Sequence, residues 1–290
     1  MPSYLFRKLC SVIILSIFAL IVMKTTSAVP VQQRSCGAVS GLSALLKRGN
    51  ILLFGELHGT REAPAFIADV VCIAAKKRIA VTLGLEIPLD EQASIDRFLD
   101  SSGGAAAEAR LTEGAFWRPE RQDGRSSIAM LHLIEQVRSL RASGYKVRIV
   151  AYDSKSGTPA QARDRVMAQN LAAVVGREPR NFLVVLSGNV HNRLTRGVPW
   201  NKEYEPLGYL LTKSSGSSRV ISFNMSHEGG EAWGCRSPSP DSDEVSCAPY
   251  SYRPQVGATA WSLKLTPASG APFSGTYGVG RITASPPAKG

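Results

Sequence analysis

The sequence lacks the short motifs that mark several large classes of enzyme. Its four histidines include no His-Glu-x-x-His pair, which argues against the commonest zinc-peptidase site. It has no Gly-x-Ser-x-Gly turn of a serine hydrolase and no glycine-rich phosphate loop. It also has no closely spaced cysteine pair of a zinc-binding module. A catalytic site in this chain must therefore be built from residues that lie far apart in the sequence.

Basic residues are in excess but form no block. The formal net charge is +11 over 290 residues, and the lysines and arginines are scattered without interleaved aromatic residues. A nucleic-acid-binding protein usually concentrates its positive charge on one stripe or helix. We therefore predict no nucleic-acid partner and expect a small molecule or a peptide as substrate.

No apolar run reaches the roughly 20 residues that a membrane-spanning helix needs. The longest, Leu9 to Met23, follows Arg7 and Lys8 and precedes small residues that end at Ala28. This order is typical of a secretory signal peptide, so we predict that residues 1–28 are removed. The mature protein would then be periplasmic or secreted, without a stable membrane span. An uncleaved membrane anchor is the alternative.

Four cysteines remain outside the predicted signal peptide, namely Cys36, Cys72, Cys235 and Cys247. An even number in an exported protein indicates two disulfides, for which three pairings exist. Cys235 with Cys247 is the easiest pair, because both lie in a Gly/Ser/Pro-rich segment that a short closed loop would order. Cys36 with Cys72 then follows by elimination.

Strand and helix patterns alternate along the chain, which predicts an α/β fold with a largely parallel central sheet flanked by helices. We expect one domain over residues 29–228, with a helical insertion that forms a pocket lid or wall, or a surface hairpin. Residues 229–290 form a Gly/Pro/Ser-rich extension, stapled by a disulfide and packed on the same domain. The predicted strands are 50–54, 79–85, 146–152, 181–186 and 219–224; the helices are 39–47, 64–77, 126–140 and 158–176; the insertion is 90–119.

Two further local features can be tested. Thr158-Pro-Ala-Gln161 has the spacing of a helix capping box, with proline at the first helical position. Residues 229–258 read as a long loop. Residues 259–284 either add an edge strand or wrap the domain.

Polar groups follow each of the first four predicted strands. Glu56 and His58 follow the first strand, Glu86 the second, Asp153 the third and His191 the fourth. The carboxyl ends of parallel strands share one edge, where ligands bind, so these side chains are expected to converge. His58 and His191 can act as base and acid. Glu56 and Glu86 can orient those rings, activate water or bind a metal.

Other residues are candidates for binding rather than catalysis. If a divalent metal is present, we expect His58, Glu86 and His191 as its ligands. Arg61 can bind a carboxylate or an oxyanion, and Glu62 suits the start of a helix. The full set of predicted substrate-binding residues is Arg61, Glu62, Asp153, Asn189 and His227, of which His227 depends on the fifth strand joining the same edge.

The motifs at these positions resemble the erythromycin esterase-like and ChaN-like proteins of the wider Tiki group. The opening motif Gly55-Glu-Leu-His-Gly-Thr-Arg-Glu62 carries most of the resemblance. Leu85-Glu86, the run Arg163 to Asn170 and Ser187-Gly-Asn-Val-His191 follow in the family's order. The resemblance implies an α/β fold with a site built from His58, Glu86 and His191. The Gly/Pro/Ser-rich extension after residue 229 matches no pattern of the group.

The resemblance leaves the activity open between two hypotheses. The first is an exported hydrolase, of esterase or metal-dependent peptidase type, in which His58 activates water and His191 assists the leaving group. The second is a ChaN-like haem-binding envelope protein that acts in haem or iron uptake, with His58, His191, His227 and Tyr152 as available axial ligands. A third reading is a scaffold whose strand-end acids only cap helices and pair with arginines.

Overall fold

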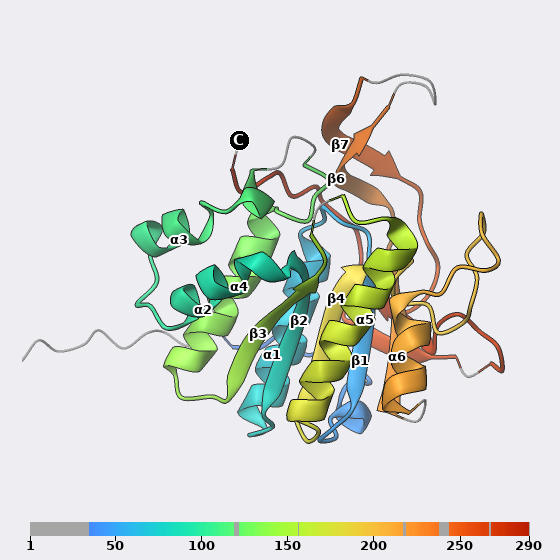
Figure 1. Cartoon of the computed structure of the whole chain (residues 1–290), viewed down its shortest axis with the longest axis horizontal. Coiled ribbons are helices and arrows are strands. Elements are labelled where there is room, and N and C mark those ends of the chain that lie inside the picture. The colour runs from blue at the N-terminus through green and yellow to red at the C-terminus, as the bar shows by residue number, and fades with distance from the viewer. Residues whose placement is uncertain are drawn as a thin grey trace, which may run out of the picture. The chain divides into compact units, whose positions relative to one another are not determined.

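The computed structural model describes residues 35–118, 122–155, 157–216, 219–237, 244–266 and 268–289 (Figure 1). All of these except Ser35 belong to one unit, Cys36–Gly290. The predicted signal peptide at residues 1–28 lies outside the described residues.

A seven-stranded sheet forms the centre of this unit, in the order β3-β2-β4-β1-β5-β9-β8. All its neighbouring strands are parallel except β8, which runs antiparallel to β9. The five strands predicted from sequence all form, and the α/β fold with a largely parallel sheet is confirmed. Their bounds are β1 Ile51–Glu56, β2 Val81–Pro88, β3 Val147–Asp153, β4 Phe182–Gly188 and β5 Val220–Ser226; β8 is Ser262–Leu265 and β9 is Gly275–Gly278.

Helices cover both faces of the sheet. α1 (Glu62–Lys76) and α4 (Ile128–Ala142) pack together on one face, while α5 (Ala160–Arg177) and α6 (Leu207–Ser215) pack on the other (Figure 1). Side chains of β1 alternate between the two faces, with Leu52 and Phe54 in the first core and Ile51 and Leu53 in the second. Every residue of β1 is buried, as expected for a strand with helices on both sides.

The predicted insertion between β2 and α4 is helical. It contains the 3₁₀ turn η2 (Leu89–Glu91), the helices α2 (Gln92–Leu99) and α3 (Ala105–Leu111), and the 3₁₀ turn η3 (Ala115–Trp117). Trp117 is fully buried in the same core as α1 and α4. This anchor holds the end of the insertion against the domain.

Two predicted helix features are wrong. The helix expected at 39–47 is reduced to a single 3₁₀ turn, η1 (Ser43–Leu45). The amide of Ser40 donates to the carbonyl of Trp261, and its carbonyl accepts from Leu263, so this backbone pairs across the chain instead of winding into a helix. The capping box also does not form, because the Thr158 hydroxyl donates to the carbonyl of Lys155 and the Gln161 amide bonds the backbone of Glu205.

The loop predicted at 229–258 is instead a two-stranded antiparallel hairpin, made of β6 (Gly230–Arg236) and β7 (Ser246–Tyr252). Cys235 and Cys247 face each other in its register and form a disulfide. Their pairing holds the two strands together, which composition alone did not reveal. The second predicted disulfide, Cys36–Cys72, is also present. Disulfides of this kind suit an oxidising compartment.

The chain after the hairpin both extends the sheet and wraps the domain. β9 pairs with β5, and β8 forms the edge. Residues 283–289 then run past the starts of α1 and α4. There Ser285 N donates to the carbonyl of Gly59, Ala288 N donates to that of Ser126, and Ala129 N donates to the Ser285 hydroxyl.

Among the described residues, no helix combines the length and the apolar character needed to cross a membrane.

We predict that Gly59→Ala destabilises the fold much more than Gly144→Ala. Both glycines have a positive φ, +73° and +81° respectively, a conformation that costs an alanine about 1 kcal/mol. A Cβ on Gly59 would also lie 2.1 Å from the carbonyl oxygen of Trp233 in β6, whereas a Cβ on Gly144 has nothing within 4 Å. The overpacking should cost Gly59→Ala about 2 kcal/mol more. Urea unfolding measures both; equal losses would contradict this packing of the hairpin.

Candidate active site

The carboxyl ends of β1, β2, β3 and β4 bring four of the predicted residues together, with Asp153 beside them. Glu56 ends β1 next to Gly188, which ends β4, and Glu86 lies on β2 near the same edge. We call the resulting set the strand-end cluster: Glu56, His58, Glu86, Gly188 and His191, with Asp123, Arg125, Asp153, Arg163 and Asp164 around them.

His58 is held by Glu56 at one ring nitrogen. Because a carboxylate only accepts hydrogen bonds, His58 Nδ1 donates to Glu56 Oε1 over 2.9 Å. His58 Nε2 then faces Glu86 Oε2 at 3.6 Å. The Glu56 side chain is 4% exposed and that of His58 is 23% exposed, so the imidazole meets the surface while its partner is buried.

Glu86 receives donors from several elements at once. Its Oε1 accepts from Arg163 Nη2 at 2.5 Å and lies 3.5 Å from Arg125 Nη1 and 3.8 Å from His191 Nε2. Its Oε2 accepts from the amide of Gly188 at 2.7 Å. A buried carboxylate needs such partners, because an unpaired buried charge is very costly.

Gly188 leaves room between the two imidazoles. A Cβ at this position would lie 3.0 Å from His58 Nε2 and 3.7 Å from His191 Cδ2. Both rings therefore approach the same small volume at the end of β4. A side chain at position 188 would displace at least one of them.

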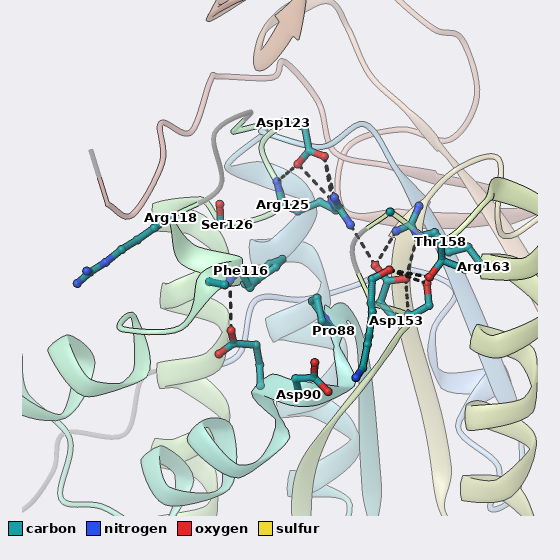
Figure 2. A pocket seen from close by; sticks show the side chains of 15 residues that line it. Pro88, Asp90, Phe116, Arg118, Asp123, Arg125, Ser126, Asp153, Thr158 and Arg163 are labelled. Atoms are coloured by element: carbon teal, nitrogen blue, oxygen red, sulfur yellow. Dashed lines mark hydrogen bonds and ion pairs between the residues drawn. The ribbon is translucent and has the colours of Figure 1, made fainter.

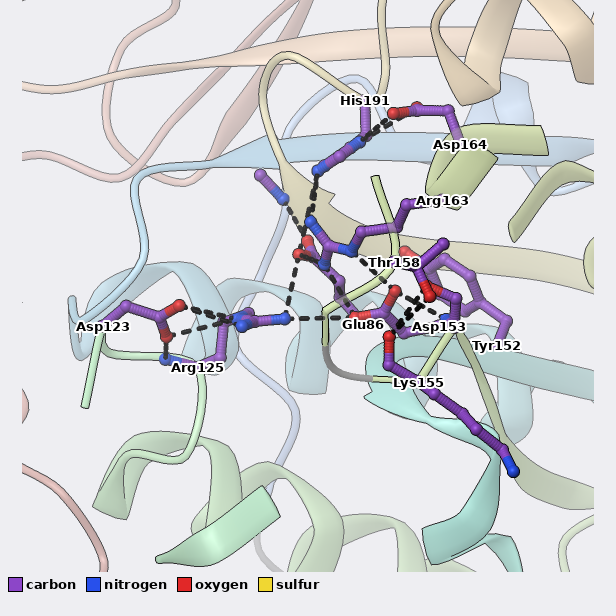
Figure 3. Close-up of polar contacts among 12 residues, drawn as sticks. Glu86, Asp123, Arg125, Tyr152, Asp153, Lys155, Thr158, Arg163, Asp164 and His191 are labelled. Atoms are coloured by element: carbon purple, nitrogen blue, oxygen red, sulfur yellow. Dashed lines mark hydrogen bonds and ion pairs between the residues drawn. The ribbon is translucent and has the colours of Figure 1, made fainter. Parts of the chain in front are cut away.

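His191 has a carboxylate partner of its own. Its Nδ1 donates to Asp164 of α5 at 2.9 Å, and its Nε2 lies 3.2 Å from Arg163 Nη1 (Figure 3). In each imidazole of the strand-end cluster, Nδ1 thus donates to a buried carboxylate and Nε2 lies on the side of Glu86. This is the arrangement that fixes the tautomer of a proton-transferring histidine.

The arginines are neutralised by acidic neighbours. Arg163 Nε and Nη2 both donate to Asp153, at 2.8 and 2.7 Å. Arg125 Nη1 donates to Asp153 at 3.1 Å, and Arg125 Nε donates to Asp123 at 3.0 Å (Figure 3). Asp153, predicted to bind substrate, is 2% exposed. Its oxygens hold two guanidinium groups, so Asp153 positions both arginines.

Negative charge exceeds positive charge in the strand-end cluster, and this excess raises the pKa values of the two histidines. Burial acts to lower the pKa of His58, but Glu86 and Glu56 outweigh it and raise that pKa to about 9. Burial likewise opposes protonation of His191, yet Glu86 and Asp164 raise its pKa. Burial raises the pKa of Glu56. Burial would also raise the pKa of Glu86, but the cations around it hold that pKa far below its usual value.

A cavity of about 750 Å³ adjoins the strand-end cluster (Figure 2). Arg125, Asp153 and Arg163 line its inner side, and Phe116 and Arg118 of the insertion line the opposite side. The helical insertion therefore supplies a pocket wall, one of its two predicted roles. Cavities of this size suit a small-molecule ligand.

Four predicted residues lie outside the strand-end cluster. Arg61 Nε donates to the carbonyl of Ala284, and Glu62 accepts from the backbone and hydroxyl of Thr283. Both thus contact the C-terminal segment, which crosses the start of α1, while Arg61 stays exposed and Glu62 half-buried.

Asn189 and His227 complete this group. Asn189 is exposed just after β4, and its backbone amide donates to the carbonyl of Glu56. His227 follows β5, accepts at Nδ1 from Gly229 N, and has its pKa lowered by burial. Among the described residues, neither side chain forms a hydrogen bond or an ion pair with His58 or His191.

Sequence reasoning assigned no role to Arg125, Arg163, Asp164 or Tyr204. Arg163 and Asp164 were visible as the first two residues of a family-like run. Arg125 and Tyr204 lie in loops and gave no local signal. Only the folded chain places them beside the strand ends.

The predicted metal ligands do not fit a metal ion, and Tyr152 does not fit as a haem ligand. Among the described residues, no three His, Cys, Asp or Glu side chains are arranged to hold a metal ion. Glu86 is bonded to a guanidinium at 2.5 Å, and a divalent cation there would sit beside two positive charges. For haem, Tyr152 is fully buried and donates its hydroxyl to the carbonyl of Leu186, so it cannot reach an iron.

Comparisons with known proteins identify the fold but no sequence relative. No family model matches the chain, and no curated protein matches it. A mutant of the erythromycin esterase EreC, in its open conformation, is similar in structure with a TM-score of 0.55 at 14% identity, over 72% of this chain and 78% of that one. A protein from Bacillus cereus is similar with a TM-score of 0.54 at 11% identity, over 86% of this chain and 92% of that one.

Sequence identities this low establish only the fold. The topology, the two-sided helical cover and these matches agree, and the described part of the chain therefore has the fold of the erythromycin esterase-like proteins.

Proposed function

We propose that this protein hydrolyses an ester, or a related acyl bond, with water activated by His58. One observation carries the proposal: two imidazoles, each with a carboxylate on Nδ1, direct Nε2 towards Glu86, beside Gly188. The fold shared with an erythromycin esterase supports an ester as the bond.

The reaction needs one proton acceptor and one proton donor. His58 Nε2 removes a proton from water as the water oxygen attacks the carbonyl carbon, and Glu56 stabilises the imidazolium that forms. The carbonyl oxygen becomes an oxyanion beside the guanidinium of Arg125, which is 27% exposed at the cavity. His191 Nε2 then gives a proton to the departing alkoxide. The products are an acid and an alcohol.

The excess of negative charge determines how His58 and His191 are protonated before the reaction. With a pKa of about 9, the His58 imidazole binds a proton at neutral pH, and the working form of the site has lost that proton. At pH 7 a group with a pKa of about 9 is deprotonated in roughly 1% of molecules. Glu56 and Asp164 keep Nδ1 protonated throughout, so only Nε2 exchanges.

Export of the protein accords with this activity. The two disulfides and the predicted signal peptide suit the periplasm or the exterior of the cell. We propose that hydrolysis takes place there, on a small substrate that fits the cavity.

We predict that His58→Gln lowers kcat/KM on a panel of small esters by at least about 100-fold, because it removes the proton acceptor. His132→Gln is the matched control, since His132 is exposed on α4. Turnover of each ester is followed by release of the alcohol. A His58→Gln protein as active as the control would refute the role of His58.

We predict that kcat/KM rises with pH from 7 towards pH 9 and falls at higher pH, where His191 loses the proton that it gives to the leaving group. The raised pKa of His58 means that the base form is scarce below pH 9, so the rate should climb by up to about tenfold per unit. Rates are corrected with His58→Gln for spontaneous hydrolysis. A profile already flat at pH 7 would show that His58 titrates at an ordinary value and would contradict the charge excess.

We predict that prolonged treatment with a chelator, followed by removal of the chelator, leaves ester turnover within about twofold of the untreated protein. The reason is that Arg163 already occupies the Glu86 oxygen that a metal would need. Metal content is measured in parallel. If turnover is lost and returns when one divalent metal is added, the conclusion that His58, Glu86 and His191 do not hold a metal ion would be wrong.

A further inference from the structure

Asp164 is the most completely buried acid of the strand-end cluster, with no exposed surface. It lies in the first half of α5, one residue after Arg163. Its oxygens accept from His191 Nδ1, from the backbone amide of Leu207 at 2.7 Å, and from the hydroxyl of Tyr204. A carboxylate with this many donors cannot turn without breaking several buried hydrogen bonds.

Its donors come from the segment that follows His191. Tyr204 ends the loop after β4, its hydroxyl also lies 3.1 Å from the carbonyl of Ala160, and it is 8% exposed. Burial, followed by the bond to Asp164, raises the pKa of Tyr204, so the hydroxyl stays a donor. Gly208 N donates to the carbonyl of His191 at 2.8 Å. The start of α6 therefore fixes both Asp164 and the backbone of His191.

The groups that face His191 divide its ring nitrogens into two roles. Nδ1 meets only acceptor oxygens of Asp164, so it carries hydrogen whether the ring is neutral or charged. Nε2 meets a donor, Arg163 Nη1 at 3.2 Å, and an acceptor, Glu86 Oε1 at 3.8 Å. Nε2 thus has a partner both when it is protonated and when it is not. Of the two ring nitrogens, only Nε2 can exchange a proton with a substrate.

We propose that Asp164 is the positioning residue of His191, holding the neutral ring as the Nδ1–H tautomer with Nε2 towards Arg163 and Glu86, while Tyr204 and the start of α6 lock Asp164. Its value for catalysis rests on the proposed function. The geometric part does not, because the tautomer can be observed without a substrate.

The first experiment is ¹⁵N NMR of histidine-labelled protein at a pH where the ring of His191 is neutral. The chain has only four histidines, and His191→Gln assigns the signal. We expect Nδ1–H with an unprotonated Nε2. Asp164→Asn exchanges one acceptor oxygen for an NH₂ donor, so the Nε2–H form should become populated. Tyr204→Phe should keep Nδ1–H but broaden or shift the signal.

The control is Asp69→Asn. Asp69 also accepts two hydrogen bonds, from Gly37 N and Trp261 Nε1, but it lies on α1 away from the cluster. It should lower the unfolding midpoint and leave the His191 tautomer unchanged. With the most active ester, Asp164→Asn should lower kcat by about 10- to 100-fold with little change in KM, whereas Asp69→Asn should leave both constants unaltered.

The outcomes separate the two proposals. An Nε2–H tautomer in the wild-type protein, or an unchanged tautomer in folded Asp164→Asn, overturns the role of Asp164. If Asp164→Asn does not fold, the wild-type tautomer and Tyr204→Phe still decide it. Retained turnover in His58→Gln, with the expected tautomer at His191, would reject the proposed hydrolysis and leave the positioning role standing.

Discussion

The structure depends on how it keeps one carboxylate, Glu86, buried and charged. The Glu86 side chain is 4% exposed, and desolvation of such a charge must be offset by close donors. Those donors come from different parts of the chain: Arg163 from α5, Arg125 from the loop before α4, Gly188 and His191 from the end of β4, and His58 from the end of β1. Removing Glu86 would leave like charges facing each other across the centre of the site.

The C-terminal segment contributes to the same site from outside. Trp233 N donates to the carbonyl of Gly59, next to His58, and Trp233 Nε1 donates to the carbonyl of Gln122, close to Arg125. Ala288 N and Ser285 N bond the loops that carry these residues. The hairpin and the final segment thus restrain the two loops that carry His58 and Arg125. This gives the Gly/Pro/Ser-rich extension a structural role in placing His58 and Arg125.

The balance of charge links the fold to its chemistry. Glu56, Glu86, Asp123, Asp153 and Asp164 bring five carboxylates against the two guanidinium groups of Arg125 and Arg163. The excess explains why the pKa of His58 and that of His191 both rise despite burial. An imidazole beside a carboxylate is a stronger base, but a smaller fraction of it is deprotonated at neutral pH. The same contacts that make the site stable therefore set the pH at which it can work.

Local residue patterns determined the layers of the fold and four members of the site. Runs such as Ile51–Phe54 and Phe182–Leu186 are apolar throughout, as expected for a strand covered on both faces, and the carboxyl ends of parallel strands lie at a common edge. Glu56, His58, Glu86 and His191 follow from that rule alone. The arginine and carboxylate partners did not follow, because Arg125, Tyr204 and Asp164 reach the edge from loops and a helix whose paths depend on packing. The β6–β7 hairpin was also decided by tertiary structure, since its strands are largely half-exposed and contain glycine and serine, and their pairing, with Cys235 opposite Cys247, appears only in the folded chain.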